Sequence, residues 1–198
     1  MGWAVEPVSE GISSPVALNE VKTHLRVIHD DEDLLIQQYI DAAVEDAELF
    51  TGRAIKRRTL RLVMDRFPRS GIIHLPFPPV RSVEEVAYID SQGMEHVISA
   101  ANYVTDLTDS RARIAPVAGY TWPVGVTQSI GGVHITYEAG YDEGLPVPVA
   151  IRQAILLTVG HFYEHREAVT TERAPEELPL GVKHLLTKGR VFIPMMDG

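Results

Sequence analysis

The sequence contains no cysteine, and this absence excludes several kinds of site. Among its 198 residues, disulfides, zinc ribbons, iron–sulfur clusters and thiol nucleophiles are impossible. Long hydrophobic runs are also missing. The longest candidate, residues 147–163, is interrupted by Pro148, Arg152, Gln153 and His161. We therefore expect no transmembrane helix and no membrane partner. The first residues carry neither a basic nor an apolar region, so we expect no signal peptide.

Positive charge is scarce in this chain. Lys and Arg number 18 against 27 Asp and Glu, which gives a formal net charge of −9. Binding to the outside of DNA depends on neutralising phosphates with Lys and Arg, so this balance argues against it. The glycine-rich loops that hold phosphates and the G-x-S-x-G sequence of serine hydrolases are absent. Nothing in the sequence requires a cofactor. Apolar residues make up 45% of the chain, which suits one globular domain.

Hydrophobic periodicity predicts helices near both ends of the chain and strands between them. The expected helices lie at about 17–26, 32–50, from Pro148 to about 163, and 180–188. The expected strands lie at 59–65, 72–75, 83–90, 95–98, 103–105, 113–115 and 133–138. Residues 83–90 are ambiguous, because Ser82-x-x-Glu85 fits a helix capping box. The turn residues 91–93 favour a hairpin, so we predict a strand.

Because strands and helices are segregated along the chain, the predicted fold class is α+β. The expected architecture is a helical bundle of two N-terminal and two C-terminal helices, with an inserted antiparallel β subdomain. We predict a single domain. Its parts are an N-terminal arm (1–14), helices (15–52), a β-rich insertion (53–141), helices (146–190) and a C-terminal tail (191–198).

One short motif suggests metal chemistry. Residues 161–165 read His-Phe-Tyr-Glu-His, which fits the H-x-x-E-H pattern of some zinc peptidases. His161 and His165 would bind the metal and Glu164 would act as general base. A third ligand would have to come from another element, and the sequence offers Glu167, Glu172, Glu176 and Glu177. The alternative interpretation is a set of polar residues at a helix end, where His suits the helix dipole.

Charge is strongly segregated between two neighbouring stretches. Residues 30–48 contain eight acids and no Lys or Arg, whereas residues 53–69 contain seven bases and one acid, Asp65. One interpretation is two solvated faces of opposite sign. The other is head-to-tail association, in which the acidic helix of one subunit meets the basic strand of the next and a ring closes. The candidate interface residues are Asp41, Glu45, Glu48, Arg53, Arg57, Arg58 and Arg61.

The chain ends in an apolar run, Val191-Phe192-Ile193-Pro194-Met195-Met196. Such a run is either buried in the core of its own chain or inserted into a groove of a partner, for which Met and Phe are well suited.

Several stretches together resemble the head–tail connector (adaptor) proteins of long-tailed phages and gene transfer agents. The resemblance covers about residues 15–192. The N-terminal stretches are Leu18-Asn-Glu-Val-Lys-Thr-His-Leu-Arg26, Asp30-Asp31-Glu32-Asp33 and Phe50-Thr-Gly-Arg-Ala-Ile55. The later ones are Leu75-Pro76-x-Pro78-Pro79-Val80-x-Ser82-Val83, Val133-x-Ile135-x-Tyr137-x-Ala139-Gly140-Tyr141, Pro148-x-x-Ile151-Arg-Gln-Ala154 and Tyr163-Glu164-x-Arg166-Glu167.

The resemblance implies a structural protein without enzymatic activity. It would be made in the host cytoplasm and would form a ring, twelvefold in the family, in the neck of a virion or virus-like particle. The ring would bind beneath the portal protein, extend the DNA channel, and support the next neck protein, a stopper or tail terminator. Double-stranded DNA would pass during packaging and ejection without specific binding. From the net charge of −9 we expect a negatively charged channel wall, along which the duplex can slide.

The resemblance also implies a role for the C-terminal segment, which inserts at the portal in such proteins. That role falls here on residues 180–196, with docking candidates Arg190, Val191, Phe192, Ile193, Met195 and Met196. The two His of the zinc-like motif are not part of the resemblance, whereas Tyr163, Glu164 and Arg166 are. In this interpretation Glu164 is a structural or interface residue.

Overall fold

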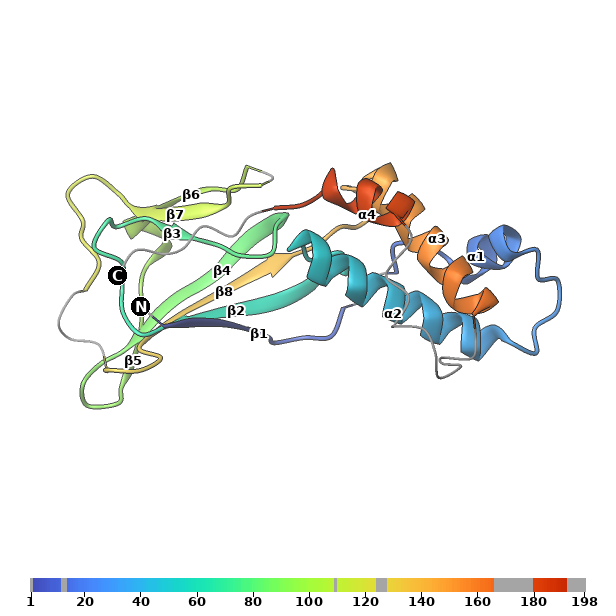
Figure 1. The fold of residues 1–198 in the computed structure, drawn as a ribbon. Coiled ribbons are helices and arrows are strands. Elements are labelled where there is room, and N and C mark those ends of the chain that lie inside the picture. The colour runs from blue at the N-terminus through green and yellow to red at the C-terminus, as the bar shows by residue number, and fades with distance from the viewer. Residues whose placement is uncertain (1, 12–13, 109, 124–127, 166–179, 192–198) are drawn as a thin grey trace, which may run out of the picture. The chain divides into compact units, whose positions relative to one another are not determined.

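A computed structural model describes residues 2–11, 14–108, 110–123, 128–165 and 180–191. The chain divides into two compact units (Figure 1). The β unit contains residues 1–12, 52–141 and 191–198, and the helical unit contains residues 13–51 and 142–190. The described part of the chain contains no helix that is long and apolar enough to cross a membrane.

The helical unit is built from four helices, at the places where periodicity predicts them. They are α1 (Leu18–Leu25), α2 (Asp33–Thr51), α3 (Val149–Glu164) and α4 (Leu180–Thr187). The C-terminal ends of α1 and α2 each have a clear local cause. Arg26 terminates α1 in the left-handed conformation at φ 60°, and Gly52 follows α2 at φ 68°, where glycine carries no Cβ penalty.

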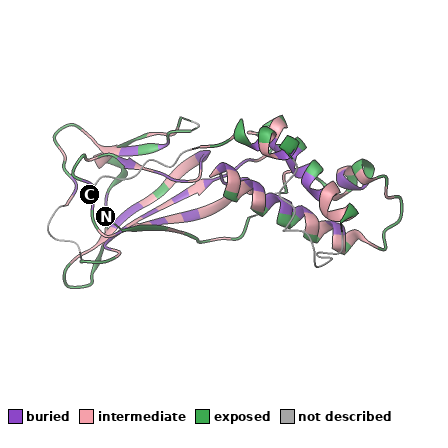
Figure 2. Cartoon of the chain, viewed as in Figure 1, coloured by how far each residue is buried: buried purple, intermediate pink, exposed green. Residues whose placement is uncertain are grey.

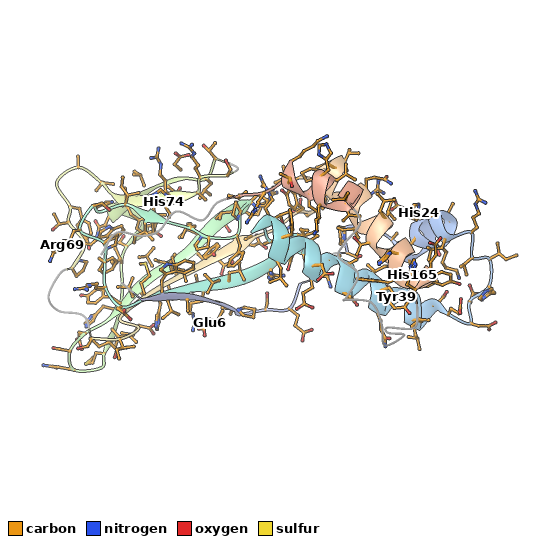
Figure 3. All side chains as sticks on the ribbon, viewed as in Figure 1. Glu6, His24, Tyr39, Arg69, His74 and His165 are labelled. Carbon is orange, nitrogen blue, oxygen red and sulfur yellow. The ribbon has the colours of Figure 1, made fainter. Side chains whose placement is uncertain are left out.

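The core of the helical unit consists of the apolar stripes of these helices (Figure 2). Their spacing of three and four residues places them on one face of each helix. In α2 the fully buried members include Ile36, Ile40 and Val44. The stripes of the other helices supply Val21, Ile151, Ile155, Val159, Val182 and Leu186. This burial, more than intrinsic propensity, holds such short helices in place.

The β unit contains two antiparallel sheets. The five-stranded sheet has the order β1-β2-β8-β4-β5 and the three-stranded sheet the order β3-β7-β6. The strands of the first are β1 (Trp3–Pro7), β2 (Arg58–Met64), β4 (Val80–Ile89), β5 (Glu95–Val97) and β8 (Val133–Ala139). The second contains β3 (Ile73–His74), β6 (Tyr103–Asp106) and β7 (Arg113–Pro116), with a short 3-10 helix, η1 (Ala100–Asn102), before β6.

Strict alternation along β2 and β8 places one face of the large sheet in the core. Leu60 and Leu62 alternate with polar or half-buried residues, and Ile135 and Tyr137 do the same on β8. Trp122 closes this core. Its ring stacks on Phe67 at 5.0 Å between centroids, and its Nε1–H donates a 2.7 Å hydrogen bond to the carbonyl of Gly71. The buried indole is thereby satisfied.

The α+β architecture with an antiparallel β insertion between two helix pairs is confirmed. The hairpin prediction for residues 83–98 also holds, since β4 pairs with β5. Strand β1 was not predicted and lies inside the segment that we expected to be an arm. Its residues are mostly exposed, and it is held through its pairing with β2. Pro7 is tolerated because β1 is an edge strand.

Candidate assembly surfaces

Several of the basic residues that follow α2 have partners within the β unit. Arg53 is buried and donates from Nη1 to the Tyr141 hydroxyl at 3.0 Å. Arg57 donates two hydrogen bonds to Glu138 from one edge of its guanidinium, with Nε 2.7 Å from Oε1 and Nη2 2.9 Å from Oε2. Gly140 makes this approach possible, because a Cβ at that position would lie 2.6 Å from the Cα of Arg57.

Arg58 and Arg61, the other two bases predicted as interface residues, are half-buried. Arg61 places Nη1 3.9 Å from Glu6 on the neighbouring strand β1. Its Nε is the one buried side-chain nitrogen or oxygen without a hydrogen-bond partner among the described residues. Arg58 is half-buried and also interacts with its own chain. Two of these charges, Arg57 and Arg61, therefore have acidic partners within the subunit.

The acidic residues of α2 are arranged differently, because two of them project from the helical unit. Asp41 and Glu45 are exposed, and Glu48 is half-exposed. Six exposed positions recur on one side of the helix, which we call the outer face of α2: Leu34, Gln38, Asp41, Ala42, Glu45 and Leu49. Asp46 lies beside this face, where burial and then the charge of Glu45 raise the pKa of its carboxyl.

The connection between α1 and α2 is fixed by a nearly buried lysine. The ammonium of Lys22 contacts Asp30 at 2.5 Å and Asp33 at 2.7 Å. The hydrogen bonds that Lys22 donates to both carboxylates raise the pKa of Lys22, and the hydrogen bond with Asp30 lowers the pKa of that carboxyl. The hydroxyl of Tyr163 on α3 donates to Glu32 in the same loop. The acidic run 30–33 therefore serves first to hold the helices of its own subunit together.

The C-terminal end of the described chain lies against α2 and α3. The guanidinium of Arg190 stands over the ring of Phe50 at 5.6 Å from its centroid. Gly189 is tightly packed, since a Cβ there would lie 2.8 Å from Cδ1 of Ile151. Val191 is half-buried. The other docking candidates, Phe192, Ile193, Met195 and Met196, lie outside the described residues.

Comparison with known proteins identifies the family. The model of the phage gp6-like head-tail connector protein family matches residues 15–118, which is more than half of the chain. The chain belongs to this family. It is a structural connector protein, as the sequence resemblance implied.

Solved structures show the same fold over nearly the whole length. A chain from the neck of an empty gene transfer agent (GTA) particle, computed with C6 symmetry, has a TM-score of 0.78 and 25% identity, with 97% of each chain covered. A chain from the virion of a native GTA particle gives 0.77 and 24%, covering 96% of this chain and 97% of that one. A chain from the neck of a native GTA particle, computed with C12 symmetry, gives 0.76 and 24%, with 97% of each covered. Curated proteins give no match.

The zinc-like motif of this connector lies at the end of α3. The rings of His161 and His165 have centroids 4.5 Å apart, and Nδ1 of His165 lies 3.0 Å from the carbonyl oxygen of His161. Among the described residues, no group of three His, Asp or Glu is placed to hold a metal ion. The possible third ligands Glu167, Glu172, Glu176 and Glu177 lie outside those residues. Neither the arrangement of the described residues nor the connector family therefore supports the alternative of a zinc-dependent hydrolase.

One structural residue of the connector escaped the sequence analysis. Asp65 is the only acid in the basic stretch 53–69. Its Oδ2 accepts a 2.8 Å hydrogen bond from the amide of Gly2, and its Oδ1 accepts one of 3.2 Å from the amide of Gly131. One carboxylate therefore ties the N-terminal strand and a distant loop to the end of β2. The sequence held one clue to this role, namely a single negative charge within a run of basic residues.

Proposed function

We propose that this connector assembles as a ring in the neck of a phage or gene transfer agent particle. The observation that carries the proposal is the match over 97% of both chains to a neck protein of a GTA particle, at 25% identity. The related chain from a native neck comes from a reconstruction with C12 symmetry, which supports a twelvefold ring here. The ring would extend the DNA channel between the head and the tail.

The partners in this proposal are the portal protein above the ring and the next neck protein, a stopper or tail terminator, below it. Residues 190–198 are proposed to dock on the portal. The apolar composition of this segment supports that role, because it is rich in Phe, Ile and Met. No catalytic step belongs to the proposed function.

Double-stranded DNA would pass through the ring without being gripped. The net charge of −9 supports this, because binding to DNA depends on an excess of Lys and Arg that neutralises phosphates. The pairing of Arg57 with Glu138 also removes one cation from that role. We expect the purified protein not to retain double-stranded DNA in a gel-shift assay at physiological salt. Salt-sensitive retention with a steep slope would contradict a passive channel.

Deletion of the gene in particle-producing cells tests the ring directly. We expect heads that are filled or empty but lack tails, and restoration of tailed particles by the intact gene in trans. Electron microscopy of the restored particles should show a ring at the neck. Particles with normal tails in the deletion strain would overturn the proposal.

Removal of residues 190–198 tests the portal contact separately. We expect the truncated chain to remain folded by circular dichroism and to lose co-purification with the portal protein. The matched control is Met94→Ser, which removes an exposed apolar side chain elsewhere and should leave co-purification unchanged. Equal recovery of the portal with the truncated and full chains would contradict the assigned docking segment.

A further inference from the structure

The outer face of α2 bears large apolar side chains that its own subunit does not cover. Leu34 is 84% exposed and Leu49 is 78% exposed, at the two ends of a stripe about 22 Å long at 1.5 Å per residue. Asp41 and Glu45 lie between them. Removing a leucine side chain from water is favourable. A helix that leaves two leucines exposed on the same face therefore has the features of a contact surface.

Two of the bases predicted as interface residues already have contacts within their own chain. Arg53 is buried against Tyr141, and the charge of Arg57 is taken by Glu138. Another part of the helical unit is basic. Residues 180–191 contain Lys183, Lys188 and Arg190 and no Asp or Glu.

The basic segment also has an exposed side of its own. Leu180, His184, Thr187 and Lys188 are exposed, whereas Val182 and Leu186 are buried against the helical unit. Lys188 directly follows Thr187, the last residue of α4, and we call these four residues the outer face of α4. Leu180 is 86% exposed. Each outer face thus combines exposed leucine with charge of one sign, negative on α2 and positive on α4.

We infer that the outer face of α2 in one subunit packs against the outer face of α4 in the next subunit. This inference rests on the proposed ring. Two different surfaces make a head-to-tail contact, which closes a ring when the rotation fits. The leucines exclude water from the contact. The opposite charges of Glu45 and Lys188 fix its direction, because contact between two copies of α2 would bring carboxylates together.

The absence of cysteine makes a crosslinking experiment unambiguous. Full-length chains carrying only Glu45→Cys or only Lys188→Cys are produced together, so that they enter the same particles. A short bis-maleimide reagent is then added. Any dimer between the two variants must join different subunits, even if the two positions also approach each other within one chain.

We expect a dimer band from the mixture and none from either variant alone. The matched control replaces Glu45→Cys with Glu143→Cys, an exposed acid of the helical unit outside α2, and should give no dimer with Lys188→Cys. A dimer of Glu45→Cys with itself, or equal yields in both mixtures, would overturn the inference.

Electron microscopy of these particles and of wild-type particles separates this inference from the proposed function. A ring at the neck without any crosslinked dimer overturns the α2–α4 contact and leaves the ring intact. Particles in which the wild-type protein forms no ring overturn both.

Discussion

Arg57, just before β2, and Glu138 on β8, which are 81 residues apart in sequence, form a bidentate ion pair. The two hydrogen bonds measure 2.7 and 2.9 Å. Such fork-to-fork geometry is stronger and more directional than a single contact with an ammonium group. The pair joins the residue before β2 to the end of β8, near the boundary of the β unit in sequence, and it removes Arg57 from the set of available surface cations.

Arg57→Lys tests the geometry of this pair. Lysine keeps the charge but cannot make both hydrogen bonds, and the site is partly exposed, so we expect a loss of about 0.5–1 kcal/mol in the free energy of unfolding. Urea denaturation with an unchanged m-value measures it. Arg69→Lys, at an exposed position, is the control. Equal denaturation midpoints for Arg57→Lys and the wild type would show that the ion pair contributes nothing to stability.

The contact of Lys22 with Asp30 predicts how stability depends on pH. The pKa of Asp30 is lowered in the folded state from its ordinary value of 3.8. Its contribution is therefore complete above that pH and is lost as the pH falls through the lower folded-state value. The pKa of Lys22 is raised above 10.5, so its contribution is lost only as the pH rises beyond that value.

We expect Asp30→Asn to destabilise the protein at pH 7 and to flatten the loss of stability below about pH 4. Urea denaturation at several pH values measures both effects. Glu143 is an exposed acid in the same unit. The control variant Glu143→Gln should lose stability below about pH 4 as the wild type does. If the stability of Asp30→Asn falls with decreasing pH as steeply as that of the wild type, Asp30 does not contribute to stability through its lowered pKa.

Asp65→Ala tests the carboxylate that ties together Gly2, β2 and Gly131. The variant loses two hydrogen bonds from backbone amides to a charged acceptor, so we expect destabilisation of about 1–3 kcal/mol. The amides of β1 should exchange with solvent faster than those of β8, since an edge strand opens first. Hydrogen exchange followed by mass spectrometry measures this. Glu84→Ala, an exposed acid on β4, is the control, and unchanged exchange of β1 in Asp65→Ala would contradict the role.

Tyr137→Phe tests a buried polar contact in the β unit. The Tyr137 hydroxyl donates a 2.8 Å hydrogen bond to the carbonyl of Pro76, and burial raises its pKa well above the ordinary value. Phenylalanine keeps the packing but leaves that carbonyl unsatisfied, so we expect a loss of about 1 kcal/mol. Thermal unfolding measures this loss. The control is Thr105→Ser, a conservative substitution at an exposed position, which should leave the melting temperature unchanged. No change in melting temperature would contradict the hydrogen bond's contribution.

The helices could be predicted from sequence because their signals are local. The stripe of Ile36, Ile40 and Val44 recurs with helical spacing, and Gly52 marks the end of α2. The β4–β5 hairpin could be predicted because its turn residues follow one another. In contrast, β1 shows no strong alternation, and its position depends on pairing with β2 about 60 residues later.

The candidate surfaces were predictable only in part, for a related reason. Sequence shows where charges are located but not which charges already have partners. Nothing near Arg57 indicates that its carboxylate partner is 81 residues away, and the acidic run 30–33 turns out to include the partners of Lys22. Exposure of Leu34 and Leu49 likewise became visible only when the helices were packed, because leucines at a helix surface look like core residues in sequence.

Charge reversal tests the polarity of the contact proposed between α2 and α4. Glu45→Lys places a cation opposite Lys188 of the neighbouring subunit, so we expect fewer tailed particles than with the wild type. Lys188→Glu should have the same effect, because it places two carboxylates together. The double variant restores the opposite charges in reversed order, and we expect it to recover particle yield. The yield is measured by counting tailed particles in electron micrographs, with Glu143→Lys as the control for added positive charge. If the double variant is no better than the worse single variant while all chains remain folded, these two residues do not face each other across the ring.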